Sequence, residues 1–185
     1  MGGTLDLRIV KTRRAIKQAF LKLRETMPLE KIRVTDICRS ATINKTTFYK
    51  HYRDIFTLSA EIENEAVALV MESFSAKDEL FRNPMCFLIE LPNALDANKD
   101  ILRPLFHDNF DKLFILLEKQ LKNRYGAADS TEEEDILLTF AIGGTLHTLR
   151  SAKFERNCDD TVLAERVSQI LAKVAQLRTE NHINI

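Results

Sequence analysis

The sequence predicts an all-α protein, with an N-terminal three-helix head that carries a helix-turn-helix and a C-terminal helical body. Three observations lead to this prediction. Apolar residues recur with the helical period along almost the whole chain of 185 residues. Only five Gly and four Pro are present, too few for the many turns of a β-protein. Hydrophobic residues make up 45% of the chain, which is enough to build a core.

The head is expected over residues 8–55 and begins with an amphipathic helix. This helix should end near Pro28, because the residue before a proline resists the helical conformation. Its apolar stripe consists of Ile9, Ile16, Ala19, Phe20 and Leu23.

Two short helices joined by a tight turn are expected over about residues 33–52. Thr35 is the expected N-cap of the first, which runs to about Ala41, and Asn44 is the expected N-cap of the second. Two short helices in this arrangement, the second with polar residues along one side, form the helix-turn-helix pattern.

In a helix-turn-helix, the second helix enters the major groove of DNA while apolar anchors hold its other face. Phe48 and Tyr52 lie four residues apart and are the expected anchors, with Ile37 and Ile43 as partners. For His51, a phosphate contact and an inert surface position are equal alternatives. The residues expected to meet base edges are Lys45, Thr46 and Thr47, and those expected to meet phosphates are Thr35, Tyr49, Lys50 and His51.

The body, residues 56–185, is predicted to be a series of helices. Asp54 should cap the first, Pro104 should kink or break the third, and Gly126 should stop it. Thr131 and Glu134 form a capping box before the fourth helix. The expected helices span about 55–76, 84–95, 98–125, 132–154 and 160–180.

Charge divides the chain in the same way. Residues 1–60 contain 13 Lys and Arg against 5 Asp and Glu, whereas residues 61–185 contain 14 against 22. A head with a formal charge of +8 suits a polyanion such as DNA. Two oppositely charged solvated surfaces are the simpler alternative.

The run "TRRAIKQAFLKLRETMPLEKIRVTDICRSATINKTTFYKHYRDIFTLSAEI" resembles the N-terminal domain of TetR/AcrR-type transcriptional regulators. The closest parallels are "VTDICRSA" and "TTFYKHYRD", and the resemblance covers about residues 8–62. It implies that Thr47, Tyr49 and His51 contact double-stranded operator DNA, with Lys45 and Thr46 nearby.

Two positions depart from the pattern of this family. Thr42 occupies a turn position where many members have Gly. Ile55 stands where a phosphate-binding Lys is common, so either Arg53 or Lys50 makes that contact or the contact is missing.

The resemblance also implies a homodimer through the last two helices, about residues 132–156 and 160–180, paired as a four-helix bundle. An apolar stripe on the last helix supports this pairing, and so do two stripes on the helix before it. The alternative is an ordinary buried hairpin within one monomer. The apolar stripe of the last helix consists of Leu163, Val167, Ile170, Leu171, Val174 and Leu177.

The resemblance also implies a small-molecule effector in the body, because in this family the corresponding region, here rich in aromatic side chains, encloses an inducer. An ordinary core is the simpler alternative for these residues. Polar candidates for lining a pocket are Arg103, His107, Asp111 and His147, each of which could equally be exposed. The apolar group consists of Met71, Phe74, Phe81, Phe87, Phe106, Phe110 and Phe114.

The predicted function is therefore sequence-specific DNA binding by a transcriptional regulator, a repressor whose affinity for DNA a ligand modulates. The alternative keeps the DNA-binding head but gives the body a protein partner, as in a co-activator-type adaptor. No GxGxxG, phosphate-binding loop, HExxH or GxSxG motif is present, so no enzymatic activity is expected.

Cofactors, metals and membranes are not expected. Cys38, Cys86 and Cys158 are far apart and odd in number, which supports neither a disulfide framework nor a zinc site. No apolar stretch approaches the length of a membrane span, and no signal peptide is recognisable, so a cytoplasmic protein is expected.

Overall fold

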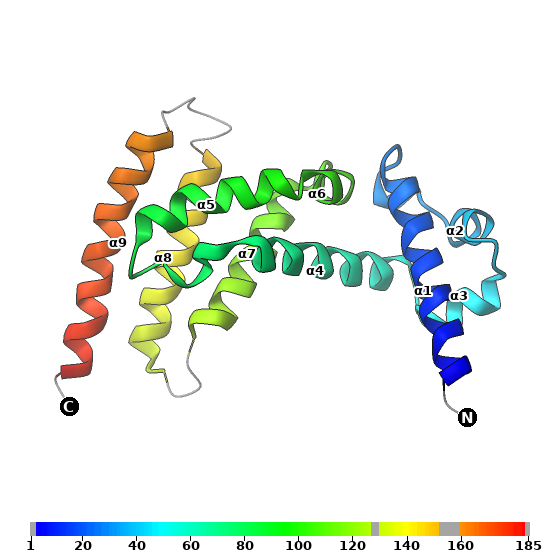
Figure 1. Cartoon of the computed structure of the whole chain (residues 1–185), viewed down its shortest axis with the longest axis horizontal. Coiled ribbons are helices and arrows are strands. Elements are labelled where there is room, and N and C mark those ends of the chain that lie inside the picture. The colour runs from blue at the N-terminus through cyan, green and yellow to red at the C-terminus, as the bar shows by residue number, and fades with distance from the viewer. Residues whose placement is uncertain (1–2, 127–129, 152–159, 184–185) are drawn as a thin grey trace. The chain divides into compact units, whose positions relative to one another are not determined.

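The computed structural model describes residues 3–126, 130–151 and 160–183 (Figure 1). Over these ranges all regular secondary structure is helical, as the sequence predicted. The elements are α1 (Gly3–Arg24), the 3-10 helix η1 (Leu29–Lys31), α2 (Val34–Ser40), α3 (Lys45–His51), α4 (Ile55–Ser73), the 3-10 helix η2 (Ser75–Asp78), α5 (Pro84–Ala97), α6 (Lys99–Phe106), α7 (Phe110–Tyr125), α8 (Glu132–Ser151) and α9 (Asp160–Ile183).

The chain divides into two compact units. Unit 1 consists of Met1–Ala66 and Lys99–Asn109, and unit 2 consists of Val67–Asn98 and Phe110–Ile185. Unit 1 therefore contains α1, α2 and α3 together with the first part of α4 and the whole of α6, whereas the sequence suggested a head that ends at residue 55. The difference arises because α6, which is distant in sequence, packs against α1.

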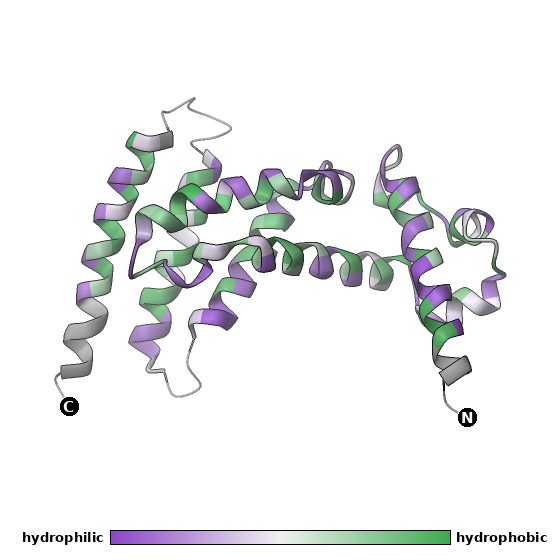
Figure 2. Ribbon diagram, viewed as in Figure 1, coloured by the Kyte–Doolittle hydropathy of each residue, from purple (hydrophilic) through white to green (hydrophobic). Residues whose placement is uncertain are grey.

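Unit 2 is built from α5, α7, α8 and α9 with the end of α4. Within it α5 packs on α9, α7 on α8, and α8 on α9. Figure 2 shows apolar residues along one side of several of these helices, the amphipathic pattern that the sequence indicated. Phe74 and Phe87 are fully buried, with ring centroids 5.0 Å apart.

Local capping signals in the sequence were read correctly. The side chain of Asn44 accepts a hydrogen bond from the Thr47 amide at 2.8 Å, and that of Asp54 accepts one from the Thr57 amide at 2.7 Å. The capping box before α8 is present, because the Glu134 carboxylate accepts a hydrogen bond from the backbone N–H of Thr131 at 2.8 Å. The helix α7 ends directly before Gly126, as expected.

Several boundaries differ from the prediction. Thr35 is not an N-cap, because α2 begins at Val34 and its N-cap is Arg33. The backbone of Arg33 is extended, and its carbonyl accepts a hydrogen bond from the Asp36 amide at 3.0 Å. The helix α4 ends at Ser73 rather than near Ala76, because extended backbone at Phe74 separates it from η2.

The long helix expected over residues 98–125 is two helices, α6 and α7. The break lies at residues 107–109, after Pro104, which stays inside α6. Asn98 does not begin a new helix in the expected way. Its side-chain nitrogen donates to the Ala94 carbonyl at 2.8 Å, and the residue is the C-cap of α5.

In the apolar stripe of α1, Ile16, Ala19 and Phe20 are buried, but Ile9 is 43% exposed because it lies beyond the core. Cys38 and Cys86 are free thiols. Cys158 and residues 152–156 of the expected dimer helix lie outside the described residues.

Candidate DNA-contacting surface

The helix α3 is held in place by two aromatic anchors. Phe48 is completely buried and Tyr52 is 2% exposed, with their ring centroids 5.9 Å apart. Ile37 of α2 is also fully buried, while Ile43 is only half-buried. The sequence prediction of these anchors is confirmed, and their burial fixes which side of α3 faces solvent.

The opposite side of α3 carries the residues that were expected to meet DNA. Lys45, Thr46, Tyr49 and Lys50 are exposed, whereas Thr47 and His51 are half-buried. Thr35 is exposed in the first turn of α2. Over the described part of the chain, none of these seven side chains forms a hydrogen bond or an ion pair. Their polar groups are therefore available to an external partner.

Tyr49 is the largest exposed side chain of this surface. It is 56% exposed, and its ring meets the buried Phe48 ring edge-on, with the two centroids 5.5 Å apart. An aromatic contact of this kind restricts the ring while leaving the hydroxyl in solvent. The Phe48 ring that anchors α3 therefore also orients Tyr49.

A carboxylate on α4 ties α1, α3 and α4 together. Both oxygens of Glu61 lie 2.6 Å from the guanidinium of Arg13, and one also lies 2.6 Å from the ammonium of Lys17. The Tyr52 hydroxyl donates to the same carboxylate at 3.2 Å, and the Arg13 guanidinium lies over the Tyr52 ring, 5.2 Å from its centroid. We call Arg13, Lys17, Tyr52 and Glu61 the Glu61 cluster.

The Glu61 cluster shifts the acidity of its own members. Burial and, to a smaller extent, the neighbouring Glu61 carboxylate raise the pKa of Tyr52 to about 12. Burial opposes ionisation of Glu61, but hydrogen bonds from Lys17 and Arg13 outweigh it and lower the pKa of that carboxyl. The cluster is therefore ionised with its hydroxyl protonated at neutral pH. It positions α3 and engages two of the head's basic side chains, which the count of charges could not show.

A second ion pair joins α1 to the segment that follows α6. Arg24 is 2% exposed, and its two terminal nitrogens lie 2.8 Å from the two carboxylate oxygens of Asp108. The same guanidinium donates to the carbonyls of Met27 at 3.1 Å and Leu105 at 2.8 Å. Nothing in the local sequence indicated this pair, because its members are 84 residues apart.

At the start of α4, Ile55 is half-buried and supplies no positive charge. Of the two basic residues considered in its place, Arg53 is paired with Asp54 at 3.0 Å, whereas Lys50 has no ionic partner among the described residues. Lys50 is thus the freer cation for a phosphate.

No family model matches the sequence, and no curated protein matches it. A solved structure does: the crystal structure of a TetR transcriptional regulator from Streptococcus agalactiae 2603V, with a TM-score of 0.63 and 20% sequence identity. The match covers 92% of this chain and 99% of that chain. The chain has the TetR fold.

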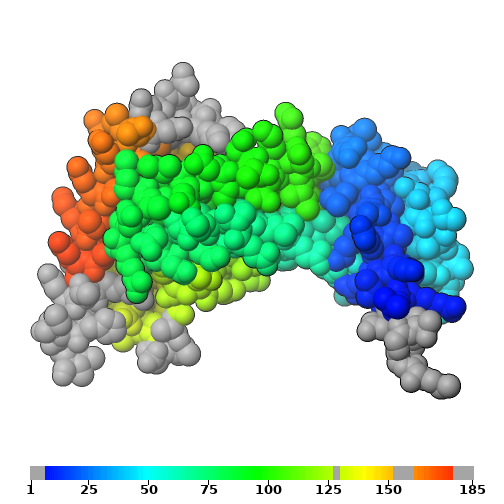
Figure 3. Space-filling view, in the orientation of Figure 1, coloured from blue at the N-terminus to red at the C-terminus, as the bar shows by residue number. Residues whose placement is uncertain are grey.

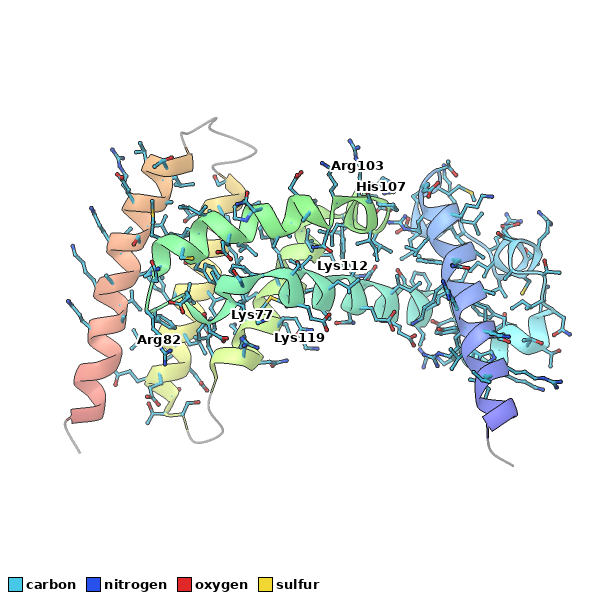
Figure 4. All side chains as sticks on the ribbon, viewed as in Figure 1. Lys77, Arg82, Arg103, His107, Lys112 and Lys119 are labelled. Atoms are coloured by element: carbon cyan, nitrogen blue, oxygen red, sulfur yellow. The ribbon has the colours of Figure 1, made fainter. Side chains whose placement is uncertain are left out.

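In this TetR fold, the polar residues considered for a pocket do not gather around one. Arg103 on α6 and His107 directly after it, both labelled in Figure 4, are exposed. Asp111 forms an ion pair with Arg150, and His147 is exposed.

A hollow does exist elsewhere in unit 2 of this TetR fold. It is open to solvent, has a volume of about 490 Å³, and lies between the end of α4, η2 and α7. Arg124 forms an ion pair with Asp78 across it, and the pKa of that carboxyl is lowered by the guanidinium. Its lining residues are Met71, Asp78, Gln120, Asn123 and Arg124.

No metal-binding group of His, Cys, Asp and Glu side chains occurs among the described residues. Over the same residues, no helix has the length and apolarity needed to cross a membrane.

Proposed function

We propose that this protein is a sequence-specific DNA-binding transcriptional regulator that acts as a homodimer in the cytoplasm. The observation that carries the proposal is the solvent face of α3. Its polar side chains have no partner in the part of the chain that the structure describes, and two buried aromatic anchors hold the helix in place. The likeness to a solved TetR transcriptional regulator supports the same function.

The roles on this surface follow from position and chemistry. Lys45, Thr46 and Thr47 form the first turn of α3, the end that reaches base edges in helix-turn-helix proteins. Tyr49 and Lys50 are exposed further along the helix, where they suit phosphate oxygens. His51, half-buried at the helix end, and Thr35 in the first turn of α2 are assigned to phosphates as well.

Selection of binding sites from a random pool tests this function. The purified full chain is mixed with duplexes that contain a randomised segment of about 30 base pairs, and bound duplexes are recovered and sequenced over several rounds. A dimer with two helix-turn-helix heads should enrich an inverted repeat with half-sites about one helical turn apart or a multiple of that distance. Absence of enrichment over an empty-matrix control would contradict the proposal.

The homodimer is proposed to form through α8 and α9. Ile136 and Phe140 of α8 are 61% and 65% exposed, and Ile170 of α9 is 57% exposed. A side chain at Gly144 would meet no atom within 4 Å, so another backbone can approach α8 closely there. Apolar exposure on both of the last helices suits a partner of the same kind.

Light scattering after size exclusion tests the dimer. Phe140→Glu places a charge on the proposed interface and should convert the dimer to a monomer. Ile115→Glu is the matched control, because Ile115 is 62% exposed on α7, outside the proposed interface. A dimer that survives Phe140→Glu and dissociates with Ile115→Glu would contradict the assignment.

We further propose that the protein is a repressor that a small ligand releases from DNA. The support is the hollow in unit 2, whose volume of about 490 Å³ lies within the range of small-molecule sites. Because Met71 lines it from α4, a ligand there would contact the helix that continues into unit 1.

A reporter gene placed behind the selected operator tests the repressor and its ligand. Extracts or compound collections should contain a molecule that derepresses the reporter, and Asn123→Trp, which fills the hollow, should abolish that response while repression persists. Ile115→Trp, on the same helix but outside the hollow, is the control. If the response survives Asn123→Trp, the ligand binds elsewhere, and a co-purifying protein that alters repression would favour the adaptor alternative.

A further inference from the structure

We propose that the first turns of α1 form a second contact with DNA, in which Arg8 and Lys11 bind backbone phosphates beside the groove that α3 enters. This inference rests on the proposed function, because it extends the surface of α3. It concerns α1 and not the helix-turn-helix pair. The charges of Arg8 and Lys11 are available because the packing of unit 1 leaves both side chains exposed.

The basic residues of α1 differ in whether a carboxylate is already bound to them. Arg13 and Lys17 face α4 and are neutralised there by Glu61, with Glu65 a further 2.5 Å partner of Lys17. Arg8 and Lys11 are exposed and form no ion pair with any described residue. Arg8 and Lys11 therefore keep their charge in solvent, close to the paired group but not part of it.

The position of these two residues follows from the Glu61 cluster. The Arg13 guanidinium lies 5.2 Å from the centroid of the Tyr52 ring, and Tyr52 is the C-cap of α3. The turn of α1 at Arg13 is thus beside the C-terminal end of α3. Lys11 and Arg8 precede it by two and five residues, about 3 and 7.5 Å along the helix axis.

The pictures agree with this placement within unit 1. Figure 1 shows the N-terminal turns of α1 and the helix α3 at the same end of unit 1. In Figure 3 these turns, in dark blue, are uncovered on the face in view. Arg8 and Lys11 are three residues apart, a spacing that puts neighbouring side chains on one side of a helix.

The exposed cations Arg8 and Lys11 are suited to binding phosphate groups. Long, flexible cations with no internal partner gain most from a dense line of negative charge, and DNA provides that along each edge of its grooves. Such contacts position a protein without reading sequence. We therefore assign Arg8 and Lys11 to affinity and orientation, and not to the choice of operator.

The salt dependence of binding tests this assignment. Full-length wild type and the double variant Arg8→Ala/Lys11→Ala are titrated onto a labelled duplex recovered by the selection, at several KCl concentrations. Each lost phosphate contact lowers the magnitude of the slope of log K against log[salt] by about 0.9, so the expected change is about 1.8 per bound protomer. The selected sequence should be unchanged.

Lys22→Ala is the matched control. Lys22 is an exposed lysine with no ionic partner among the described residues. It is on nearly the same side of α1 as Lys11, but it lies 11 residues further along, about 16 Å from the proposed contact. Its removal should leave the slope as in the wild type. Circular dichroism of each variant shows that α1 and the rest of the fold persist.

The outcomes separate this inference from the proposed function. An unchanged slope in the Arg8→Ala/Lys11→Ala variant, or an equal loss in Lys22→Ala, would overturn the inference while leaving a DNA-binding protein. A chain that recovers no duplex from the pool would overturn the proposed function and this inference with it.

Discussion

Arg24 and Asp108 form a two-pronged ion pair across 84 residues of sequence, with both guanidinium nitrogens 2.8 Å from carboxylate oxygens. The pair joins the last turn of α1 to the turn that follows α6. The Nε of Arg24 is buried without a partner among the described residues. The buried guanidinium is therefore stabilised by Asp108 and by the two carbonyls that it contacts. A buried cation of this kind is destabilising when its counter-charge is lost.

Asp108→Asn should lower the free energy of unfolding by about 3 kcal/mol, near the lower end of the cost of breaking a buried ion pair, because the Asp108 side chain is partly exposed. Urea denaturation followed by circular dichroism measures it. Asp111→Asn removes a carboxylate from the more exposed pair with Arg150 and is the control, with an expected loss below about 1 kcal/mol. Equal losses of unfolding free energy in the two variants would contradict the claim that burial of Arg24 makes its ion pair the stronger one.

The same pair predicts how stability depends on pH. Hydrogen bonds from Arg24 lower the pKa of Asp108 to about 2, against 3.8 for an unperturbed aspartate. The folded protein therefore keeps this carboxylate ionised where the unfolded chain would protonate it, and the stabilisation is present above the unfolded value and is lost as the pH falls toward 2. The difference in unfolding free energy between wild type and Asp108→Asn should shrink over that window. A difference that stays constant from pH 6 to about 2 would refute this link.

Thr42 is in the left-handed region, with φ of 54°, in the turn between α2 and α3. This conformation is costly for a β-branched residue and is readily adopted by glycine. Thr42→Gly should raise the free energy of unfolding by about 1 kcal/mol, the left-handed strain less the chain entropy that glycine adds. Thr42→Val keeps the branched side chain and should give no gain. Chemical denaturation of both variants measures these free energies of unfolding. A destabilised Thr42→Gly protein would argue against strain at this turn.

Glu61 is the acceptor that α1, α3 and α4 share, so Glu61→Gln should lower the free energy of unfolding by about 1–2 kcal/mol by weakening charge-assisted bonds to Arg13 and Lys17. Glu65→Gln is the comparison, since Glu65 contacts only Lys17 in this group and its side chain is 53% exposed. Its loss should be below about 1 kcal/mol. Thermal and urea unfolding of the two variants measure the difference, which would vanish if the Glu61 cluster did not hold the head together.

Sequence alone was enough to predict what depends on neighbouring residues. Asn44, Asp54 and the pair Thr131–Glu134 cap helices where expected, because a cap needs a side chain only about three residues from the amide that it binds. The anchors Phe48 and Tyr52 were found by helical spacing. The prediction that Thr35 is the N-cap was wrong by two residues, because extended backbone at Arg33 begins α2 earlier.

Features that depend on distant residues could not be predicted in this way. The partners of Arg24 and Glu61 lie on other helices, so no local pattern marks them. The count of charges correctly indicated a basic head, but not that Arg13 and Lys17 are already paired with Glu61 and Glu65. The break between α6 and α7 was expected at Pro104 and lies three residues later, because α6 continues through that proline.

The central claim is that the solvent face of α3 binds DNA, and its most direct test is the affinity of a double variant in that face. Fluorescence anisotropy with the selected duplex compares wild type, Thr47→Ala/Tyr49→Ala and the control Gln18→Ala, which alters an exposed polar residue of α1 instead of α3. Each lost contact is worth about 1–3 kcal/mol, so the double variant should bind at least about tenfold more weakly while remaining folded. Wild-type affinity in the Thr47→Ala/Tyr49→Ala protein would contradict the assignment of this surface.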